Sequence, residues 1–471
     1  MRIATRALRR LAVGAVALAA SCATVPDLDR EILARHAEPV QVRSAHGGVL
    51  SREASAKVLE DLRRRSPQTS VLDRYAALEQ ALAGTPLSLG NKATLLQDGR
   101  AAYGAMLQAI RGARSSIHLE MYIFEAGDVG REFAAALAER RRAGVEVRVL
   151  YDSVGSKDTP AEFFEGMRRQ GIEVVEYNPV STASLLEKGL ALQHRDHRKL
   201  MVVDGRVAFL GGINISKTYG PAPRGPGGSA PAPTADMPFE DRPWRDTQLR
   251  LEGPVVAQLQ RLFLEQWARE RKDSPLAGAR YYPQLGPAGS EIVRAIAGSP
   301  DDGVDALYVA LISAIDNAET QVRITNAYFV PARELREALE NAARRGVDVR
   351  LVLPSRSDSW LVTNAARSYY DELLSAGVKI YEREGRLLHA KTASIDGVWS
   401  TVGSTNLDWR SLVHNDELNA VVLGPEFAAA MDRAFADDVA HSRAITLAQW
   451  RDRSFLGRAR EAAARAFARL L

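Results

Sequence analysis

Two segments of the sequence carry the same polar residues at the same spacing. In each, a histidine is followed by a lysine, an aspartate, a glycine and an asparagine at offsets of 2, 7, 14 and 17 residues. These residues are His197, Lys199, Asp204, Gly211 and Asn214 in the first segment, and His389, Lys391, Asp396, Gly403 and Asn406 in the second. Side chains two positions apart on a β-strand point to the same face. Each histidine–lysine pair is therefore spaced to direct an imidazole and an ammonium group at one phosphate.

This set of groups suits the cleavage of a phosphodiester. Without a metal ion, that reaction needs a nucleophile, a proton donor for the leaving alkoxide and positive charge around the phosphoryl oxygens. The two histidines can fill the first two roles, because imidazole titrates near neutral pH, and the two lysines can supply the charge. Asn214, Asn406 and Ser404 are candidate neutral donors to the phosphate. With one cysteine and no glycine-rich lysine loop, the sequence predicts neither a metal site nor a cofactor.

A single histidine–lysine pair would be a weak signal, because a solvated strand edge accounts for it equally well. Two copies with the same downstream offsets, in a chain that has only nine lysines, favour a functional site. The two aspartates of the motifs follow apolar runs at Asp-Gly turns. We count Asp204 and Asp396 with the catalytic motif, and expect them to serve structure more than chemistry.

The elements that must position these residues also occur twice. Apolar runs at 118–124 and 322–329 are each followed by a helical pattern and a second apolar run, and each half then adds a further helix and strand. Alternating strands and helices of this length predict an α/β fold with mostly parallel sheets and flanking helices. We expect two similar α/β domains related by a pseudo-two-fold. The alternative, two unrelated α/β domains, does not account for the repeated motif.

The repeated pattern His-x-Lys-x4-Asp, followed by Gly-(Gly/Ser)-x-Asn, resembles the duplicated HKD motif of the phospholipase D superfamily. The resemblance covers about residues 89–445. Four further segments are similar to bacterial cardiolipin synthases, namely Gly90-Asn91, Tyr122-Ile-Phe124, His194–Lys199 and Gly211–Ser216. The N-terminal segment of this chain is lipoprotein-like and differs from that of those synthases, many of which begin with two membrane-spanning helices or with no leader.

The resemblance implies a phosphatidyltransferase. Phosphatidylglycerol would be split, and its phosphatidyl group would pass through a phosphatidyl-histidine to a second phospholipid alcohol, giving cardiolipin. By the same resemblance, His197 is the nucleophile and His389 protonates the leaving group. The residues themselves do not distinguish the two histidines. Hydrolysis to phosphatidic acid, a nuclease of the same fold and a non-catalytic lipid-binding lipoprotein are the alternatives.

A nucleophilic histidine needs its other ring nitrogen fixed by a carboxylate or carbonyl. Asp246 and Glu417 are the candidates, since each lies seven residues before a Gly-Pro. Glu417 lies 28 residues after His389 and Asp246 lies 49 after His197, and a stretch rich in proline, glycine and alanine at 219–238 accounts for most of the surplus. We therefore expect 219–238 to be a flexible insert and the two carboxylates to be equivalent. The alternative is that they are surface charges that pair with neighbouring arginines.

The N-terminal residues have the pattern of an export signal. A basic start, an apolar stretch over 11–20 and Ser21-Cys22 resemble a bacterial lipobox, in which Cys22 is acylated. A plain signal peptide and an uncleaved anchor are the alternatives. We expect a lipoprotein of the bacterial cell envelope that faces the periplasm.

Composition agrees with contact to anionic partners. The chain has 471 residues, 46% hydrophobic and 25% charged, with a net charge of +4 and a pI near 9.1. The charge alone does not choose among phospholipid, nucleic acid and phosphate ester. The lack of an extended basic run argues against nucleic acid, and the resemblance implies phospholipid substrates and a membrane surface. The oligomeric state is left open. Residues 447–471 fit an interfacial helix on anionic lipid, or equally a terminal helix docked on the body.

The expected organisation follows from these features. It comprises a lipoprotein-like signal peptide (1–22), an N-terminal helical extension (23–88), a first phospholipase D-like domain (89–275, with the insert 219–238), a second such domain (290–445) and a C-terminal amphipathic basic helix (446–471).

Overall fold

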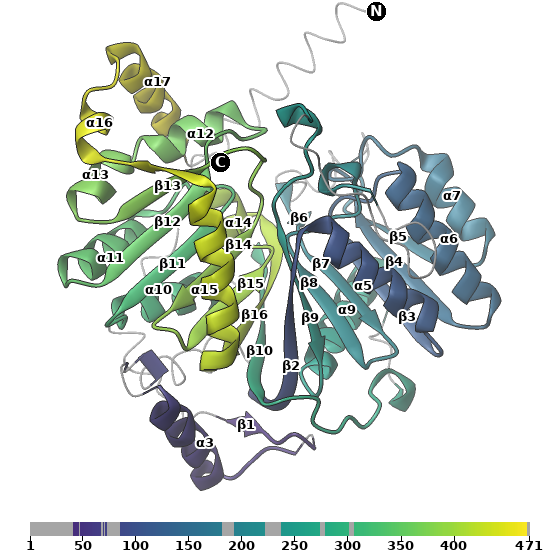
Figure 1. Cartoon of the computed structure of the whole chain (residues 1–471). Coiled ribbons are helices and arrows are strands. Elements are labelled where there is room, and N and C mark those ends of the chain that lie inside the picture. The colour runs from purple at the N-terminus through teal and green to yellow at the C-terminus, as the bar shows by residue number, and fades with distance from the viewer. Residues whose placement is uncertain are drawn as a thin grey trace, which may run out of the picture.

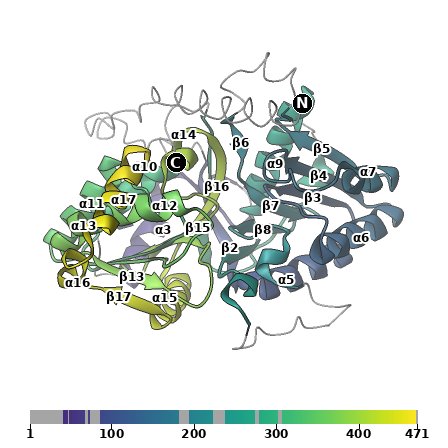
Figure 2. The same cartoon turned by 90° about the horizontal axis from the view of Figure 1, so that it is seen from above.

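The computed structural model describes residues 41–46, 48–66, 69, 71–72, 85–180, 193–221, 237–273, 278–300 and 306–468 of the chain. They form two α/β halves that lie side by side, with strands at the centre and helices outside (Figures 1 and 2). The predicted α/β class is confirmed. The signal peptide, Cys22 and most of the predicted insert lie outside the described residues.

In the first half, β3, which pairs with the strand that carries the motif, lies at the centre of the pairing. β3 pairs in parallel with β4 and antiparallel with β7, and the series continues to β5 on one side and to β8 and β9 on the other. The strands are β3 (Ser116–Met121), β4 (Glu146–Asp152), β5 (Glu173–Tyr177), β6 (Arg195–Asp196), β7 (Lys199–Val203), β8 (Val207–Gly211) and β9 (Thr247–Glu252).

The second half repeats this pairing scheme. β11 pairs in parallel with β12 and antiparallel with β14, and the series continues to β13 on one side and to β15 and β16 on the other. The strands are β10 (Glu291–Gly298), β11 (Gln321–Asn326), β12 (Asp348–Pro354), β13 (Lys379–Arg383), β14 (Lys391–Ile395), β15 (Trp399–Gly403), β16 (Asn415–Leu423) and β17 (Ser442–Ile445).

The sheet is mixed rather than mostly parallel. Parallel pairs occur where a helix connects two strands, as from β3 to β4 and from β11 to β12. After each histidine motif the chain reverses at an Asp-Gly turn instead, so that β7 and β8, and likewise β14 and β15, are antiparallel. The strands that carry the motifs therefore belong to the antiparallel part of the sheet.

Two pairings between named strands join the halves. β2 (Leu87–Gln97) pairs first with β10 and then with β9. Gly90, at φ 77°, lies in the part of β2 beside β10, and a Cβ there would lie 2.6 Å from the Cβ of Ala45. The second connection is a short parallel pairing of β6 with β16. Through these pairings the strands among the described residues form one continuous 17-stranded sheet.

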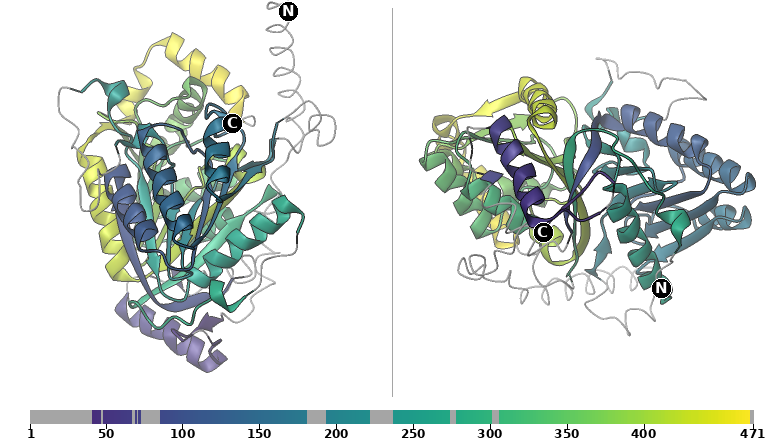
Figure 3. Two further views of the ribbon diagram at one scale, coloured as in Figure 1. Left: turned by 90° about the vertical axis from the view of Figure 1, so that its right-hand side faces the viewer. Right: turned by 90° about the horizontal axis from the view of Figure 1, so that it is seen from below.

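Helices cover both faces of each half, because apolar residues recur on one side of each helix. In α6, for example, Val129, Phe133 and Leu137 are buried. α5, α6 and α7 cover one face of the first half and α9 covers the other (Figure 3). The apolar cluster under α9 also includes residues of β10, β15 and β16 from the second half. The helices are α5 (Asp98–Gly112), α6 (Asp128–Arg142), α7 (Ala161–Arg169), α9 (Val256–Arg271), α10 (Ala306–Asp316), α11 (Arg333–Arg344), α12 (Trp360–Arg367), α13 (Tyr370–Ser375), α14 (Trp409–Val413) and α15 (Pro425–Ala440).

The two ends of the chain add short elements. In the N-terminal region, predicted to be helical, the structure has β1 (Val42–Arg43) as well as the helix α3 (Arg52–Arg65). The predicted C-terminal helix is divided into α16 (Leu447–Arg451) and α17 (Phe455–Ala466), which pack against α13 and α12 respectively. The domain boundaries proposed from the sequence stay a prediction. No helix among the described residues combines the length and the apolar character needed to cross a bilayer.

Candidate active site

The first histidine motif is held against the second half by the pairing of β6 with β16. Asp196, the last residue of β6, is in register with Asp416. The backbone N–H of His197 donates to the carbonyl of Asp416 at 2.9 Å. Glu417 is the next residue of β16. The pairing therefore places a carboxylate of the second half beside the imidazole of the first.

The second motif is held in the corresponding way against the first half. Arg245 and Leu388 form an isolated parallel bridge, and the backbone N–H of His389 donates to the carbonyl of Arg245 at 2.8 Å. Asp246 follows directly. Each histidine is thus bonded through its backbone to the residue that precedes a carboxylate of the other half.

The side chains complete both pairs. The Nδ1 atom of His197 lies 3.0 Å from Oε1 and 3.1 Å from Oε2 of Glu417. The Nδ1 atom of His389 lies 2.7 Å from Oδ2 of Asp246. The spacing along the sequence relates each carboxylate to the histidine of its own repeat. In the structure, each carboxylate instead contacts the histidine of the other repeat. Neither carboxylate is a surface charge, since both are buried.

Asp246 is fixed by its backbone surroundings. The N–H of Thr247 donates to its Oδ1 atom at 2.7 Å, and its own N–H donates to Oδ1 of Asp98 at 3.1 Å. Gly212 lies against the carboxylate, because a Cβ there would be only 2.2 Å from Oδ1. The Gly-Gly of the first motif thus leaves room for the acid that contacts the second histidine.

Glu417 is held by side chains instead. The hydroxyl of Ser404 donates to its Oε2 atom, and the amide of Asn415 donates to Oε1 at 3.2 Å. The sequence had suggested Ser404 as a donor to the phosphate. In this structure the hydroxyl proton of Ser404 is directed at Glu417, and a contact of Ser404 with the phosphate stays a prediction.

Tyr219 is a site residue that the sequence analysis assigned to the flexible insert. Its side chain is buried, and its hydroxyl lies 3.1 Å from Nδ1 of His389. The hydroxyl also accepts from the amide of Asn214 at 3.2 Å and donates to the carbonyl of Gly212 at 3.3 Å. The predicted insert boundary is therefore wrong at its start, and residues 222–236 lie outside the described part of the chain.

Each motif lysine lies beside the histidine of its own motif and near a tyrosine ring. Lys199 donates to the carbonyl of His197, and Lys391 does the same to His389 at 2.5 Å. The Nζ atom of Lys199 lies 4.9 Å from the ring centre of Tyr122, and that of Lys391 lies 5.9 Å from the ring centre of Tyr328.

The same tyrosines lie edge-on to the histidines, with ring centres 4.9 Å apart for Tyr122 and His197 and 6.1 Å apart for Tyr328 and His389. Each lies just after the strand that pairs with its motif strand, Tyr122 after β3 and Tyr328 after β11. Trp244 adds a further ring to the second histidine, 5.3 Å from His389. A tyrosine shortly before a phenylalanine in each half, Tyr122-Ile-Phe124 and Tyr328-Phe329, was the available signal for the tyrosines, and no repeated pattern pointed to Trp244.

The two asparagines occupy different environments. The Oδ1 atom of Asn214 accepts from the backbone N–H of Ile123 at 3.0 Å, and its amide is bonded to Tyr219. The Oδ1 atom of Asn406 is buried and has no hydrogen-bond partner among the described residues. Their proposed contact with the phosphate stays a prediction.

The motif aspartates lie at the far ends of the motif strands from the histidines. Asp204 and Asp396 occupy their turns at φ 54° and 50°. The carboxylate of Asp204 accepts backbone N–H groups of residues 114–116, and that of Asp396 accepts those of residues 319–321. These contacts fix the loops before β3 and β11. Such bonds agree with the expectation that Asp204 and Asp396 serve structure more than chemistry.

Burial dominates the electrostatics of the site. It lowers the pKa of Lys199 to about 7 and that of Lys391 to about 8, and raises the pKa of Glu417 to about 7. The pKa of His197 is held well below its usual value by burial and by the charges of Lys199 and Lys391. Burial and Lys391 also lower the pKa of His389, while the charge of Asp246 acts in the opposite direction. A phosphate bound between the lysines would favour their charged forms.

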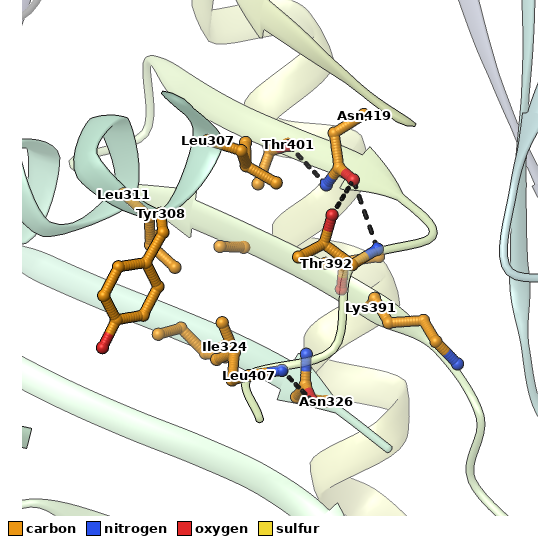
Figure 4. Close-up of a pocket in the computed structure, with 12 residues that line it drawn as sticks. Leu307, Tyr308, Leu311, Ile324, Asn326, Lys391, Thr392, Thr401, Leu407 and Asn419 are labelled. Atoms are coloured by element: carbon orange, nitrogen blue, oxygen red, sulfur yellow. Dashed lines mark hydrogen bonds between the residues drawn. The ribbon is translucent and has the colours of Figure 1, made fainter. Parts of the chain in front are cut away.

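Lys391 also borders a pocket that lies between α10 and the sheet of the second half (Figure 4). The ammonium group of Lys391 points away from the apolar side chains of this pocket (Figure 4). Asn419 closes one side through hydrogen bonds with Thr401 and Thr405. The pocket therefore lies on the side of Lys391 that is opposite its ammonium group. Its apolar lining is provided by Leu307, Leu311, Ile324 and Leu407.

The chain is similar to known proteins over most of its length. The family model described as "Cardiolipin synthase, PLD-like domain" matches residues 106–219 and 311–439, which include both histidine motifs. The cardiolipin synthase of Halalkalibacterium halodurans is 33% identical over 414 residues, which are 88% of this chain and 78% of that protein. The cardiolipin synthase of Geobacillus kaustophilus is 34% identical over 387 residues, 82% of this chain and 74% of that protein.

A solved structure shares the fold. The phosphatidylserine synthase of Haemophilus influenzae matches 83% of this chain and 96% of its own, with a TM-score of 0.62. Its sequence identity to this chain is 12%. At that identity the likeness concerns the arrangement of the strands and helices alone.

Proposed function

The chain belongs to the cardiolipin synthase family of phospholipase D-like proteins, and we propose that it joins two phospholipids by phosphatidyl transfer through His197. The resemblance found in the sequence is thereby confirmed for the family. One observation carries the proposal of mechanism. Two buried histidines each contact a carboxylate of the other half at Nδ1, which leaves both Nε2 atoms for the reaction.

In the first step, the Nε2 atom of neutral His197 attacks the phosphorus of phosphatidylglycerol. The bond from phosphorus to the glycerol oxygen breaks, and His389 gives its Nε2 proton to the leaving glycerol. Glu417 keeps the Nδ1 proton of His197 in place throughout. The products of this step are free glycerol and a phosphatidyl group bound to His197.

In the second step, His389 accepts the proton of a hydroxyl group on a second phosphatidylglycerol. That oxygen attacks the phosphorus, the bond to His197 breaks, and cardiolipin leaves. Lys199 and Lys391 stabilise the negative charge of the phosphoryl oxygens in both steps. Since no hydride, electron or nucleotide takes part, the reaction needs no cofactor.

The surroundings of the two histidines support His197 as the nucleophile. A nucleophile must be neutral, and the pKa of His197 is held well below its usual value. Its partner Glu417 has a raised pKa of about 7 and gives weak support to an imidazolium. A general acid must hold a proton. Burial and the charge of Lys391 lower the pKa of His389 as well, but the charge of Asp246 opposes this shift and favours the protonated form.

The reaction is tested by lipid analysis after expression in a bacterial host that lacks cardiolipin, with the His197→Asn variant as control. The appearance of cardiolipin with wild type alone supports transfer. Phosphatidic acid alone would assign the chain to hydrolysis, which differs only in the acceptor, since water then takes the place of the lipid alcohol. An unchanged lipid composition would favour the remaining alternative, a lipid-binding protein without catalytic activity.

We also propose that the chain works on a membrane surface, attached through an acylated Cys22 and facing the periplasm of a bacterial cell. A phospholipid substrate with two acyl chains resides in a bilayer, so the enzyme must work at its surface. The support for the attachment is the lipobox-like sequence before Cys22.

A further inference from the structure

We propose that the outer face of α17, together with Trp360, is a docking surface for an anionic phospholipid bilayer. We call it the docking surface and define it by Trp360, Phe455, Leu456 and Phe467, flanked by Arg458 and Arg460. The inference rests on the proposed function for its biological sense, since an enzyme that acts on lipids must approach them. Its physical basis is independent of catalysis.

α17 is fixed to the body of the protein by one face. Its buried residues are Glu461 and Ala464, and Ala468 follows on the same side. Glu461 accepts from Arg453 at 2.7 Å, and Arg465 donates to Glu372 of α13 at 2.7 Å. The helix therefore has a defined orientation, and its opposite face is presented outward.

That outward face is apolar. Phe455, Leu456 and Phe467 are 74%, 68% and 50% exposed. At about 100° per residue the exposed alanines of α17 fall on the same side, and no charged residue lies among them. A helix at the surface of a soluble protein ordinarily has polar residues on this face. The exposed alanines are Ala459, Ala462, Ala463 and Ala466.

Arginines border this apolar face. Arg458 and Arg460 are exposed, and their side chains form no hydrogen bond or ion pair within the described residues. In contrast, Arg451 is paired with Asp371. Apolar side chains bordered by unpaired cations suit the interface of a bilayer with acidic headgroups. Anionic lipid is therefore the partner that fits the charge as well as the apolar surface.

Trp360 connects this surface to the active site. It is the first residue of α12, is 60% exposed, and α12 packs against α17. Two residues earlier, Asp358 accepts a hydrogen bond from the hydroxyl of Tyr328 at 2.6 Å, and Tyr328 lies edge-on to His389. In Figure 1, β6 and α14 lie nearer to the end of the molecule that carries α12 and α17 than to the end that carries α3. Docking through this surface would place the site next to the lipid.

The single cysteine of the chain allows a direct test of contact. In full-length protein carrying Cys22→Ser, we would introduce Leu456→Cys and label it with an environment-sensitive fluorophore. Val49→Cys, 56% exposed near β1 at the opposite end of the molecule, is the matched control. We expect a blue shift and quenching by a lipid-phase quencher at position 456, but not at 49, with vesicles of phosphatidylcholine and phosphatidylglycerol.

Three results would overturn the docking surface. They are an unchanged spectrum at 456 in the presence of vesicles, an equal shift with vesicles of phosphatidylcholine alone, and a shift that follows protein concentration without lipid. The last would assign the surface to a second copy of this chain. None of these measurements depends on turnover, so they remain informative if the proposed reaction is wrong.

A kinetic test separates docking from chemistry. The triple variant Phe455→Ser, Leu456→Ser and Phe467→Ser removes three exposed apolar side chains without disturbing the buried face of α17. We expect turnover of phosphatidylglycerol in vesicles to fall on the order of a hundredfold, with turnover of a short-chain monomeric analogue unchanged. Equal loss on both substrates would mean that the residues act on the fold or the site and not on docking.

Discussion

The imidazole of His197 is hydrogen-bonded to the carboxylate of Glu417, which lies 220 residues further along the chain. The reverse exchange, His389 with Asp246, spans 143 residues. Each half of the protein therefore supplies the acid that orients the histidine of the other half.

Replacement of either carboxylate should affect chemistry more than folding. We expect Glu417→Gln and Asp246→Asn to lower kcat by about 10²–10⁴-fold, because each amide no longer fixes the ring nitrogen as the carboxylate does. Turnover of a monomeric substrate and the circular dichroism spectrum would be measured together. Glu384→Gln, at an exposed position, is the matched control. A near-normal kcat in either site variant would mean that the replaced carboxylate is not needed to orient its histidine.

The two histidines should fail differently. His197→Asn cannot form the covalent intermediate with any substrate. His389→Asn should fail on phosphatidylglycerol yet partly recover on an aryl phosphodiester, whose phenolate leaves without a proton donor. Acid-quenched mass spectrometry would show which histidine carries phosphate. Phosphate on His389, with aryl-ester rescue of the His197 variant, would reverse the assignment of the two roles.

The motif lysines should matter for turnover and little for stability. We expect Lys199→Met and Lys391→Met each to lower kcat/KM by about 10²-fold or more, since each removes positive charge from the phosphoryl group in the transition state. Thermal unfolding should change little, because a buried charge is replaced by an apolar side chain of similar length. Lys57→Met, exposed on α3, serves as the control. Full activity in one of the two variants would mean that the other lysine alone stabilises the phosphoryl group.

Phosphate binding to the free enzyme should weaken as the pH rises. Lys199, with a pKa lowered to about 7, and Lys391, with a pKa lowered to about 8, are charged below these values and neutral above them. The affinity for inorganic phosphate as a competitive inhibitor should therefore fall from pH 7 to pH 9. In Lys199→Met the fall should occur around pH 8 alone. An affinity that is constant over this range would show that the lysines keep their charge.

Acylation should depend on Cys22. We expect Cys22→Ala to abolish the incorporation of labelled palmitate and to leave a soluble form or an uncleaved precursor. Gel mobility and fractionation of cells expressing the full chain would measure both effects. Label that still enters the variant would contradict the lipoprotein proposal.

Much of the fold followed from periodicity, since apolar runs alternate with helical patterns in both halves. The direction of the strands after each motif did not, because an Asp-Gly turn such as Asp204-Gly205 reverses the chain where a helix would have kept the strands parallel. Trp450 illustrates a similar limit. Its spacing fitted the apolar face of one long helix, yet it lies in the separate α16 and packs on Tyr370, with ring centres 4.8 Å apart.

The histidines, lysines and both carboxylates of the site could be found from spacing alone. Their pairing could not, because counting along the chain compares residues within a repeat, whereas the pairing of β6 with β16 acts between repeats. Tyr219 was missed for a local reason. It lies directly before a segment rich in glycine and proline, so composition assigned it to the insert although its ring is buried against Trp244.

The pairing of β6 with β16 also sets the moment during synthesis at which the protein can become active. A nascent chain that has not yet reached residue 417 holds His197 without its acid, and Asp246 lacks a histidine until residue 389 is made. Incomplete or prematurely terminated products therefore cannot assemble the site. Phosphatidyl transfer begins only when nearly the whole chain has been synthesised and folded.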